Sequence, residues 1–354
     1  MDKLEKFYKK KKIFITGHTG FKGSWLVSVL LNYGAKVVGY SKNDKKRKGY
    51  EKFVNYKKVK NIYGDILDIK KIKLSLSKHK PDIIFHLAAQ ALVSDSYIDP
   101  VKTFQTNVIG SINVMEASRF YPKIKSIVMI TSDKCYDNKE ITRGYREEDT
   151  LGGSDPYSAS KAAAEIAYNS FNKSFFAKKK KIGIASARAG NVIGGGDWSK
   201  DRLIPDCIRA VMKKKNLTIR SPSATRPWQH VLEPVSGYLV LGEKLYKKPK
   251  FYSGSWNFGP HSNQTKSVQE VIKIVLKVVD KKKQCKVIIK KGNFKESTLL
   301  KLNSNKSNKK LQWKTNWTMN NSIMQAAIWY DYYLNKANIK QLTQKQINSY
   351  FKKK

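Results

Sequence analysis

The chain has few cysteines and no long apolar run. Its 354 residues include three cysteines, Cys135, Cys207 and Cys285, which lie far apart. Cysteines so few and so scattered exclude a disulfide scaffold and a cysteine-based zinc site, and we expect no metal. No run of about 18 apolar residues occurs, which argues against a membrane-spanning helix.

The amino-terminal segment imitates a signal peptide, because lysines at 9–12 precede an apolar stretch. Polar residues such as Thr16, His18 and Lys22 interrupt that stretch, and no small-residue cleavage site follows. We therefore expect a soluble, cytoplasmic protein without membrane association.

Acidic residues are scarce: 27 Asp and Glu face 70 Lys and Arg, for a formal charge of +43. Sixty-one of the basic residues are lysines, and they occur from one end of the chain to the other. Nucleic-acid binders more often concentrate charge on one face and use arginine for bidentate contacts. We interpret the charge as compositional drift and expect no specific nucleic-acid partner. A polyanion-binding protein that reuses the fold stays an alternative, and binding that vanishes at moderate salt would mark it as adventitious.

Hydrophobic residues make up 40% of the chain, enough for a large core in about two domains. Short apolar runs alternate with amphipathic stretches, which predicts strands at 11–17, 35–41, 81–90, 124–132 and 181–191 and helices at 24–34, 100–120 and 156–171. This alternation is typical of an α/β fold with a doubly wound parallel sheet of the Rossmann type.

The pattern loosens after residue 190, where helices are expected near 203–214 and 267–279 and a final helix at 320–335. We predict a dinucleotide-binding domain over 1–190, with 226–258 returning to it. A smaller, interleaved substrate-binding domain would comprise 191–225 and 259–354.

A glycine-rich loop, GHTGFKG (17–23), follows the first expected strand and opens the first expected helix. Glycine lets the backbone turn tightly and approach a pyrophosphate, whose charge then lies at a helix N-terminus. The spacing of Gly17, Gly20 and Gly23 is the short-chain dehydrogenase form. The loop therefore predicts a dinucleotide cofactor.

Residues after the second and third strands bear on which dinucleotide binds. NAD-binding folds usually have an acid at the end of the second strand that holds the ribose hydroxyls. Here Asp44 comes late, while basic residues could accept a 2′-phosphate, namely Lys42, Lys45, Lys46 and Arg47. Local chemistry thus leaves NAD and NADP open. Asp65, followed by Ile66, stands where an acid commonly reaches the adenine.

Tyrosine followed four residues later by lysine is a weak signal in this chain, because seven tyrosines show it: Tyr8, Tyr56, Tyr121, Tyr157, Tyr246, Tyr332 and Tyr350. Only Tyr157 starts an expected helix after a strand that ends in Thr131-Ser132-Asp133. On one helix face, the Lys161 ammonium is expected to lower the pKa of Tyr157 and favour phenolate. Tyr157 could then take a proton from a substrate hydroxyl.

Taken together, GHTGFKG (17–23), HLAAQ (86–90), YSASK (157–161) and ARAGNVIGGGDW (187–198) resemble the extended short-chain dehydrogenase/reductase family over nearly the whole chain. With TSDKCYDN (131–138), the chain is most similar to the nucleotide-sugar 4,6-dehydratases that act on CDP-glucose.

The resemblance implies NAD as cofactor, a CDP-sugar substrate, a homo-oligomer (dimer or tetramer) and a role in deoxysugar and polysaccharide biosynthesis. It implies catalytic roles for Ser132, Asp133, Lys134, Tyr157 and Lys161. It implies cofactor contacts from Gly17, Thr19, Gly20, Phe21, Lys22, Gly23, Asp65, Ile66, Leu87, Ala88, Ala89, Gln90 and Asn107. It implies substrate contacts from Asn191, Arg202 and Arg226.

The chain departs from thymidine-nucleotide relatives, which have Thr-Asp-Glu where it has Ser132-Asp133-Lys134. The implied reaction oxidises C4 with Tyr157 as base, removes water across C5–C6 with Asp133 as acid, and returns hydride to C6. Lys134 is either the C5 base, which requires a neutral amine, or a cation that stabilises the enolate. Another nucleotide-sugar enzyme, a 4-epimerase or a dehydratase for a different nucleotide, stays an alternative.

Overall fold

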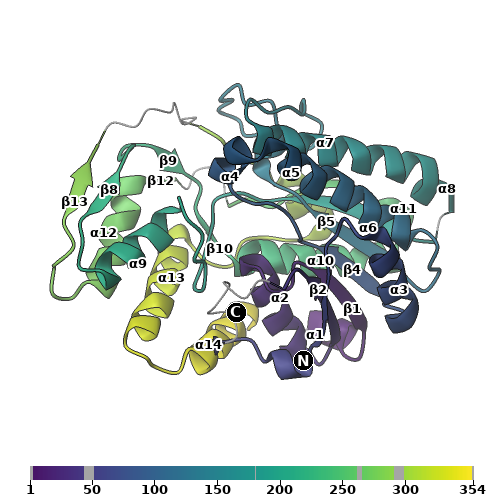
Figure 1. Ribbon diagram of the computed structural model, residues 1–354, viewed down its shortest axis with the longest axis horizontal. Helices are drawn as coiled ribbons and strands as arrows, with labels where there is room; N and C mark the ends of the chain where they lie inside the picture. The colour runs from purple at the N-terminus through teal and green to yellow at the C-terminus, as the bar shows by residue number, and fades with distance from the viewer. Residues whose placement is uncertain (1–2, 44–51, 180, 261–264, 291–298, 353–354) are drawn as a thin grey trace.

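A seven-stranded sheet forms the centre of the molecule (Figure 1). The computed structural model describes residues 3–43, 52–179, 181–260, 265–290 and 299–352. The strand order is β11-β6-β5-β4-β1-β2-β3, with neighbours parallel throughout. The strands are β1 (Lys12–Thr16), β2 (Lys36–Ser41), β3 (Lys60–Tyr63), β4 (Ile83–His86), β5 (Ser126–Ile130), β6 (Gly183–Arg188) and β11 (Gly254–Asn257). The predicted doubly wound parallel sheet is confirmed.

Alternate residues along each strand supply two cores, one on each face of the sheet. Ile13 and Ile15 of β1 join one hydrophobic cluster, whereas Phe14 between them joins the other. The first cluster includes α2 and α10, and the second includes α3, α6 and α7. Because successive side chains of a strand point to opposite faces, strands with apolar side chains on both faces require helices on both sides of the sheet.

The helices that cover the sheet begin at recognisable sequence signals. Helix α7, for example, is capped by Asp155, whose carboxylate accepts a 2.9 Å hydrogen bond from Ser158 N, and Pro156 occupies its first turn. These helices are α1 (Lys3–Tyr8), α2 (Phe21–Asn32), α3 (Ile69–His79), α4 (Val93–Ile98), α5 (Pro100–Phe104), α6 (Gly110–Ser118), α7 (Pro156–Phe171), α8 (Ala177–Lys179), α10 (Leu232–Lys247) and α11 (Pro249–Tyr252). Short 3₁₀ helices occur between them at η2 (Tyr56–Lys58) and η4 (Asp133–Cys135), and π-helical turns at η3 (Gln105–Ile109) and η5 (Asn172–Phe176).

A second group of elements gathers at one end of the molecule (Figure 1). It includes β8 (Leu217–Ile219), β13 (Val287–Ile289), α9 (Leu203–Met212) and α12 (Val268–Val279). Two further strand pairs are β7 (Val192–Ile193) with β10 (Gln229–His230) and β9 (Thr225–Arg226) with β12 (Lys266–Ser267). The chain continues through η6 (Ser307–Leu311), α13 (Met319–Leu334) and α14 (Ile339–Phe351). Strand β11 returns to the main sheet between β10 and β12 along the chain, whereas the full division into two domains stays a prediction.

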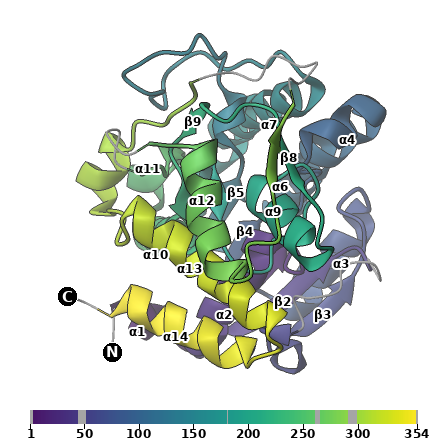
Figure 2. The same ribbon diagram turned by 90° about the vertical axis from the view of Figure 1, so that its left-hand side faces the viewer.

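One prediction about the end of the chain is wrong: 320–335 is not the final helix. Helix α14 follows it and packs beside α2, where Tyr33 and Phe351 form an edge-to-face pair with centroids 5.6 Å apart (Figure 2). The segment's lysines and glutamines dilute its apolar periodicity, which hid the helix. Its start does have a signal, because the Asn338 side chain accepts a hydrogen bond from Gln341 N.

The predicted helix at 100–120 is divided into α5, a wider π-helical turn at η3, and α6. The predicted strand at 81–90 ends at His86, because residues 87–90 leave the sheet as a loop. Within the described ranges, no helix has the length and apolar character needed to cross a membrane. The same residues contain no group of three His, Cys, Asp or Glu side chains placed to hold a metal ion.

Candidate active site

The glycine loop is packed so tightly that side chains at Gly17 and Gly23 would collide with neighbouring backbone atoms. Gly17 has a left-handed φ of 71°, and a Cβ there would lie 2.7 Å from Ala88 N. A Cβ on Gly23 would lie 2.2 Å from the carbonyl oxygen of Gly17. Gly20 caps α2 without a side-chain hydrogen bond, so the first N–H groups of that helix face the loop. This strand, turn and helix fit the pyrophosphate of a dinucleotide.

The loop lies where the strand order reverses, between β1 and β4. In parallel α/β sheets, ligands bind at such a switch point, beyond the carboxyl ends of the strands. Leu87 N donates to Thr16 O over 3.0 Å and Ala88 N to Thr16 Oγ1 over 3.2 Å, so the loop after β4 is fixed beside β1. Ala89 is half-buried in the same loop.

Asn107 joins this loop to the helix that carries Tyr157. Its Oδ1 accepts from Gln90 N over 2.9 Å, and its Nδ2 donates to Ser160 Oγ over 2.8 Å. Asn107 is buried, so both contacts are shielded from water. The predicted cofactor residues Gln90 and Asn107 are therefore brought together with the catalytic helix.

Asp65, the predicted adenine contact, already interacts with two residues of the protein. Asp65 forms a 2.8 Å ion pair with Lys42, and its Oδ1 accepts from Leu67 N over 3.1 Å. Lys42 is thus engaged with an acid, while Asp44, Lys45, Lys46 and Arg47 lie outside the described residues. Ile66 is buried, and a Cβ added to Gly110 would lie 2.4 Å from its Cδ1.

The remaining residues of the glycine loop are of two kinds: Thr19 and Phe21 make structural contacts, whereas Lys22 lies near the candidate catalytic residues. Thr19 Oγ1 donates to Ser41 Oγ over 3.1 Å, and Phe21 is buried in the core. Lys22 instead approaches the carboxyl ends of the strands, where burial, Arg202 and Lys161 lower its pKa to about 8 while Asp133 opposes them. The structure therefore places the amine of this predicted cofactor residue among the catalytic side chains.

Tyr157, Ser132, Asp133 and Lys161 are all at least nine-tenths buried and come from α7 and the end of β5. Ser132 Oγ donates to Asp133 Oδ1 over 3.0 Å, and both residues are close enough to Tyr157 to affect its pKa, Ser132 lowering it and Asp133 raising it. A Cβ on Gly190 would lie 1.7 Å from Asp133 Oδ2, so only glycine lets the carboxylate occupy this place. Lys134 follows in η4, half-buried, with its N–H donating to Ser132 Oγ over 3.3 Å.

The predicted lowering of the Tyr157 pKa is wrong for this geometry. Burial raises the pKa of Tyr157, and the opposing effects of the Ser132 hydrogen bond and of Arg202 do not outweigh it. The Lys161 amine lies 5.9 Å from the centre of the tyrosine ring. Burial also lowers the pKa of Lys161 to about 8, because a charge is costly away from water.

The predicted substrate residues are placed differently from one another. Asn191 has a left-handed φ of 51° and lines a small cavity, of about 10 Å³, together with Asp133 and Gln229. Arg202 forms a 3.1 Å ion pair with Asp197 and is close enough to Tyr157 to affect its pKa. Arg226 lies on β9, in register with Lys266 of β12.

Sequence analysis missed two groups in this region. Gln229 donates through Nε2 to Gly190 O over 3.0 Å, and its buried Oε1 has no partner in the structure. Glu165 and Arg188 form a buried ion pair directly behind the catalytic residues. The motif RPWQHV (226–231) and the position of Glu165 one turn after Lys161 could have drawn attention to them.

A larger hollow, of about 520 Å³, lies at the opposite edge of the sheet. Its lining is strongly basic and includes Lys12, Lys36, Lys58, Lys60, Lys78 and His79. It borders the amino-terminal ends of β1 and β3, whereas the candidate catalytic side chains come from α7 and from the segment after the carboxyl end of β5. The hollow is therefore separate from the candidate active site.

These features define a Rossmann-type, short-chain enzyme in which Ser132, Tyr157 and Lys161 are buried side by side. A family model described as GDP-mannose 4,6 dehydratase matches residues 14–326, and the chain belongs to this family. It is 40% identical over 350 residues to the CDP-glucose 4,6-dehydratase of Salmonella typhimurium, with 97% of each chain covered.

Solved structures agree with the fold. The UDP-glucose 4-epimerase of Thermotoga maritima, solved with UDP-glucose, superimposes with a TM-score of 0.79 at 20% identity and covers 91% of this chain and 99% of that one. The dTDP-glucose 4,6-dehydratase of Bacillus anthracis, solved with NAD, gives a TM-score of 0.72 at 21% identity, covering 94% and 99%.

The tight glycine loop gives one direct prediction. Gly23→Ala is expected to abolish measurable NAD binding, because the new methyl group would overlap the Gly17 carbonyl and force the loop apart. Gly34→Ala is the control: its nearest atom would be 3.7 Å away on a side chain, although its φ of 70° carries some strain. Isothermal titration with NAD would contradict the assignment if Gly23→Ala bound as tightly as the control.

Proposed function

We propose that this chain is an NAD-dependent nucleotide-sugar 4,6-dehydratase that converts CDP-glucose to CDP-4-keto-6-deoxyglucose. The observation that carries the proposal is the buried cluster of Ser132, Asp133, Tyr157 and Lys161 beyond the carboxyl ends of the strands. The 40% identity to a CDP-glucose 4,6-dehydratase over nearly the full length supports the choice of nucleotide.

The cofactor is held by the glycine loop and by the loop after β4. Gly17, Gly20 and Gly23 would let the pyrophosphate approach the N-terminus of α2, and Leu87, Ala88, Ala89 and Gln90 would hold the cofactor from the loop after β4. When bound there, NAD supplies a hydride acceptor for C4 of the sugar and a hydride donor for C6. In this proposal, residues 1–190 and 226–258 hold NAD, and 191–225 with 259–354 hold the nucleotide sugar.

The side chains of the site then have separate roles. Tyr157 Oη takes the proton from O4 of glucose, with Ser132 Oγ hydrogen-bonded to it and the Lys161 ammonium favouring its anionic form. The new 4-keto group makes the C5 proton acidic. Asp133 donates a proton to the departing C6 hydroxyl. Lys134 either takes the C5 proton as a neutral amine, or stays protonated and stabilises the enolate while another group takes that proton. One water leaves, and the substrate undergoes no net oxidation.

Arginines and amides suit the diphosphate of the substrate. We assign this role to Arg202, Arg226 and Asn191. Arg202 has the strongest support, because it lies close enough to both Tyr157 and Lys22 for its charge to lower their pKa values.

The nucleotide is tested by incubating the purified protein with CDP-, UDP-, dTDP- and GDP-glucose, with and without added NAD. We expect a 4-keto-6-deoxy product, detected by a mass 18 units lower, from CDP-glucose. If the product formed only from another nucleotide sugar, the dehydratase reaction would be supported but the cytosine assignment would be overturned. A 4-epimer of unchanged mass would overturn the dehydratase assignment.

We also propose a cytoplasmic homodimer or tetramer. All three cysteines are free thiols, as expected in a reducing compartment. Tyr97, Ile98, Val101 and Ile166 are exposed on α4, α5 and α7, which lie against one another and form an apolar face suited to a second copy. Light scattering of Ile98→Glu/Val101→Glu should give a smaller mass than wild type, and an unchanged mass would exclude this face.

A further inference from the structure

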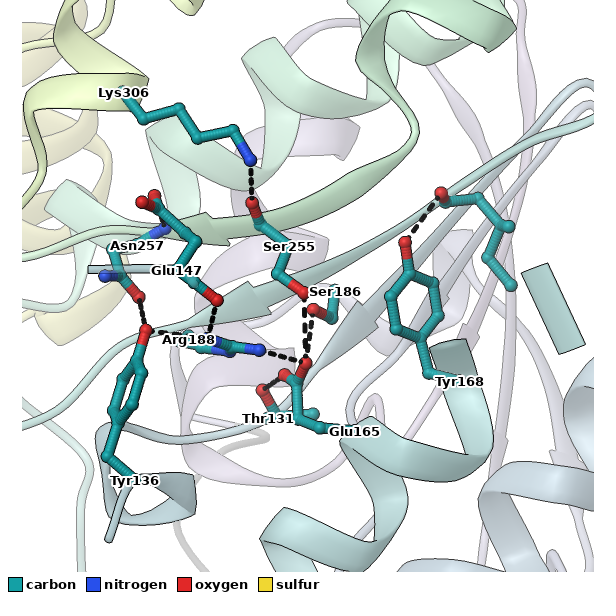
Figure 3. A network of polar contacts seen from close by, with 11 residues as sticks. Thr131, Tyr136, Glu147, Glu165, Tyr168, Ser186, Arg188, Ser255, Asn257 and Lys306 are labelled. Carbon is teal, nitrogen blue, oxygen red and sulfur yellow. Dashed lines mark hydrogen bonds and ion pairs between the residues drawn. The ribbon is translucent and has the colours of Figure 1, made fainter. Parts of the chain in front are cut away.

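Glu165 is a fully buried carboxylate at the centre of a network of polar contacts (Figure 3). Glu165 Oε1 accepts from Thr131 Oγ1 over 2.5 Å, and Oε2 accepts from Ser186 Oγ over 2.8 Å. Oε2 also forms a 2.7 Å ion pair with Arg188 Nη2. Burial would raise the pKa of Glu165, but Arg188 and the hydrogen bonds from Arg188, Thr131 and Ser186 lower it below its usual value. Glu165 is therefore an anion at neutral pH.

Glu165 and two of its partners, Thr131 and Arg188, are next to the candidate catalytic residues in the sequence. Thr131 immediately precedes Ser132 and Asp133, and Glu165 follows Lys161 by one helical turn. Arg188 precedes Gly190, against which the Asp133 carboxylate lies. One side chain thus ties the end of β5, the end of β6 and helix α7 together.

Arg188 extends the network away from the site. Its Nη1 donates to Tyr136 OH over 2.7 Å and to Glu147 O over 3.1 Å. Tyr136 OH in turn donates to Asn257 Oδ1 over 2.8 Å, on β11 (Figure 3). The guanidinium therefore needs Glu165 as its counter-ion, because both charges are buried.

The titratable groups that face Lys161 come from several elements. Its own helix presents Tyr157 and Glu165, η4 presents Cys135, β4 presents His86, and α2 presents Lys22. Burial raises the pKa of the Cys135 thiol well above its usual value, and burial together with Lys161 lowers the pKa of His86 to about 3, so both are neutral at pH 8. Lys22 repels a charge on Lys161. Glu165 is the group among these that is anionic at that pH and favours the Lys161 ammonium.

We propose that Glu165 is a positioning residue for the reaction: it keeps Lys161 charged beside Tyr157 and fixes the end of β5 against the catalytic helix. The inference rests on the proposed dehydratase function, since it concerns the same Tyr157 and Lys161. Glu165 reaches the substrate only through other residues.

The test uses Glu165→Gln in the full-length protein, which keeps one acceptor oxygen, for Thr131 Oγ1, and removes the charge; the amide nitrogen replaces the oxygen that accepts from Ser186 and Arg188. Without the anion, Lys161 loses its proton at lower pH. The alkaline limb of the kcat–pH profile is expected to move down by roughly one pH unit, and kcat at pH 8 to fall about fivefold. KM for CDP-glucose should stay unchanged, because no substrate contact is lost.

Glu165→Gln strands the Arg188 charge and lowers stability, so a second variant separates folding from electrostatics. Glu165→Gln/Arg188→Met removes both charges and fills the volume, and we expect it to recover much of the thermal stability. Its alkaline limb should stay shifted. If the double variant recovered both the thermal stability and the kcat–pH profile of wild type, the role of Glu165 would be purely structural. That result would overturn the inference.

Glu233→Gln is the matched control. Glu233 is also fully buried, accepts from Trp317 N over 2.8 Å and lies on α10, so its loss should lower stability without moving the alkaline limb.

Acetylation of Lys161 by acetic anhydride measures the shift in its pKa without turnover. The extent of labelling is followed over a range of pH by peptide mass spectrometry. A wild type inactive on every nucleotide sugar would reject the proposed function, whereas labelling identical in wild type and Glu165→Gln would reject the role of Glu165.

Discussion

Tyr157→Phe is expected to lower the rate of CDP-4-keto-6-deoxyglucose formation by about 10²- to 10⁴-fold, the usual contribution of a positioned general base. Removal of the O4 proton comes first, so oxidation, elimination and reduction all depend on the Tyr157 hydroxyl. The measurement is the initial rate of product formation, by mass, at saturating CDP-glucose and NAD.

Tyr168→Phe provides a matched control on the same helix. Tyr168 is buried and its hydroxyl donates to Ile184 O over 3.2 Å, remote from Ser132. The control should lose some stability but little activity. Comparable activity in both variants would mean that Tyr157 is not the base.

Asp133→Asn/Lys134→Ala is the second prediction with a large effect. The double variant should still bind CDP-glucose and NAD, but its dehydration rate should fall by about 10²- to 10⁴-fold, because both the acid for C6 and the cation beside C5 are gone. Product analysis at pH 7 gives the rate, and isothermal titration confirms binding. Dehydration at the wild-type rate would contradict the assignment.

Lys134→Arg distinguishes the two roles open to Lys134. Arginine keeps the positive charge but stays protonated, so it cannot accept the C5 proton. Retained activity would identify Lys134 as the enolate-stabilising cation, and activity as low as that of Lys134→Ala would identify it as the C5 base.

The parts of the fold that follow from local pattern were predictable. Helix α7 matches the predicted 156–171 because Asp155, Pro156 and an alanine-rich run define it without tertiary help. The glycine loop was equally readable as a motif, although only Gly23 is required by a contact within the strand–turn–helix unit itself, whereas Gly17 is required by Ala88 in the loop after β4. Helix α14 was missed because its burial depends on α2, more than 300 residues away, rather than on a strong apolar stripe.

The site was only partly predictable for a similar reason. Ser132, Asp133, Tyr157 and Lys161 belong to recognisable motifs, and the structure brings them together. The pKa of Tyr157 depends on burial, which spacing along a helix does not reveal. Glu165 acquires its importance from Thr131, Ser186 and Arg188, which only the assembled sheet places around it.

The central claim is that one hydride moves from C4 to C6 of the same sugar while water is lost. The most direct test is incubation with CDP-[4-²H]glucose and unlabelled NAD, followed by mass and proton analysis of the product. The account predicts a 4-keto-6-deoxy sugar that retains the deuterium at C6. A product without deuterium at C6, or recovery of CDP-galactose with no loss of water, would contradict it.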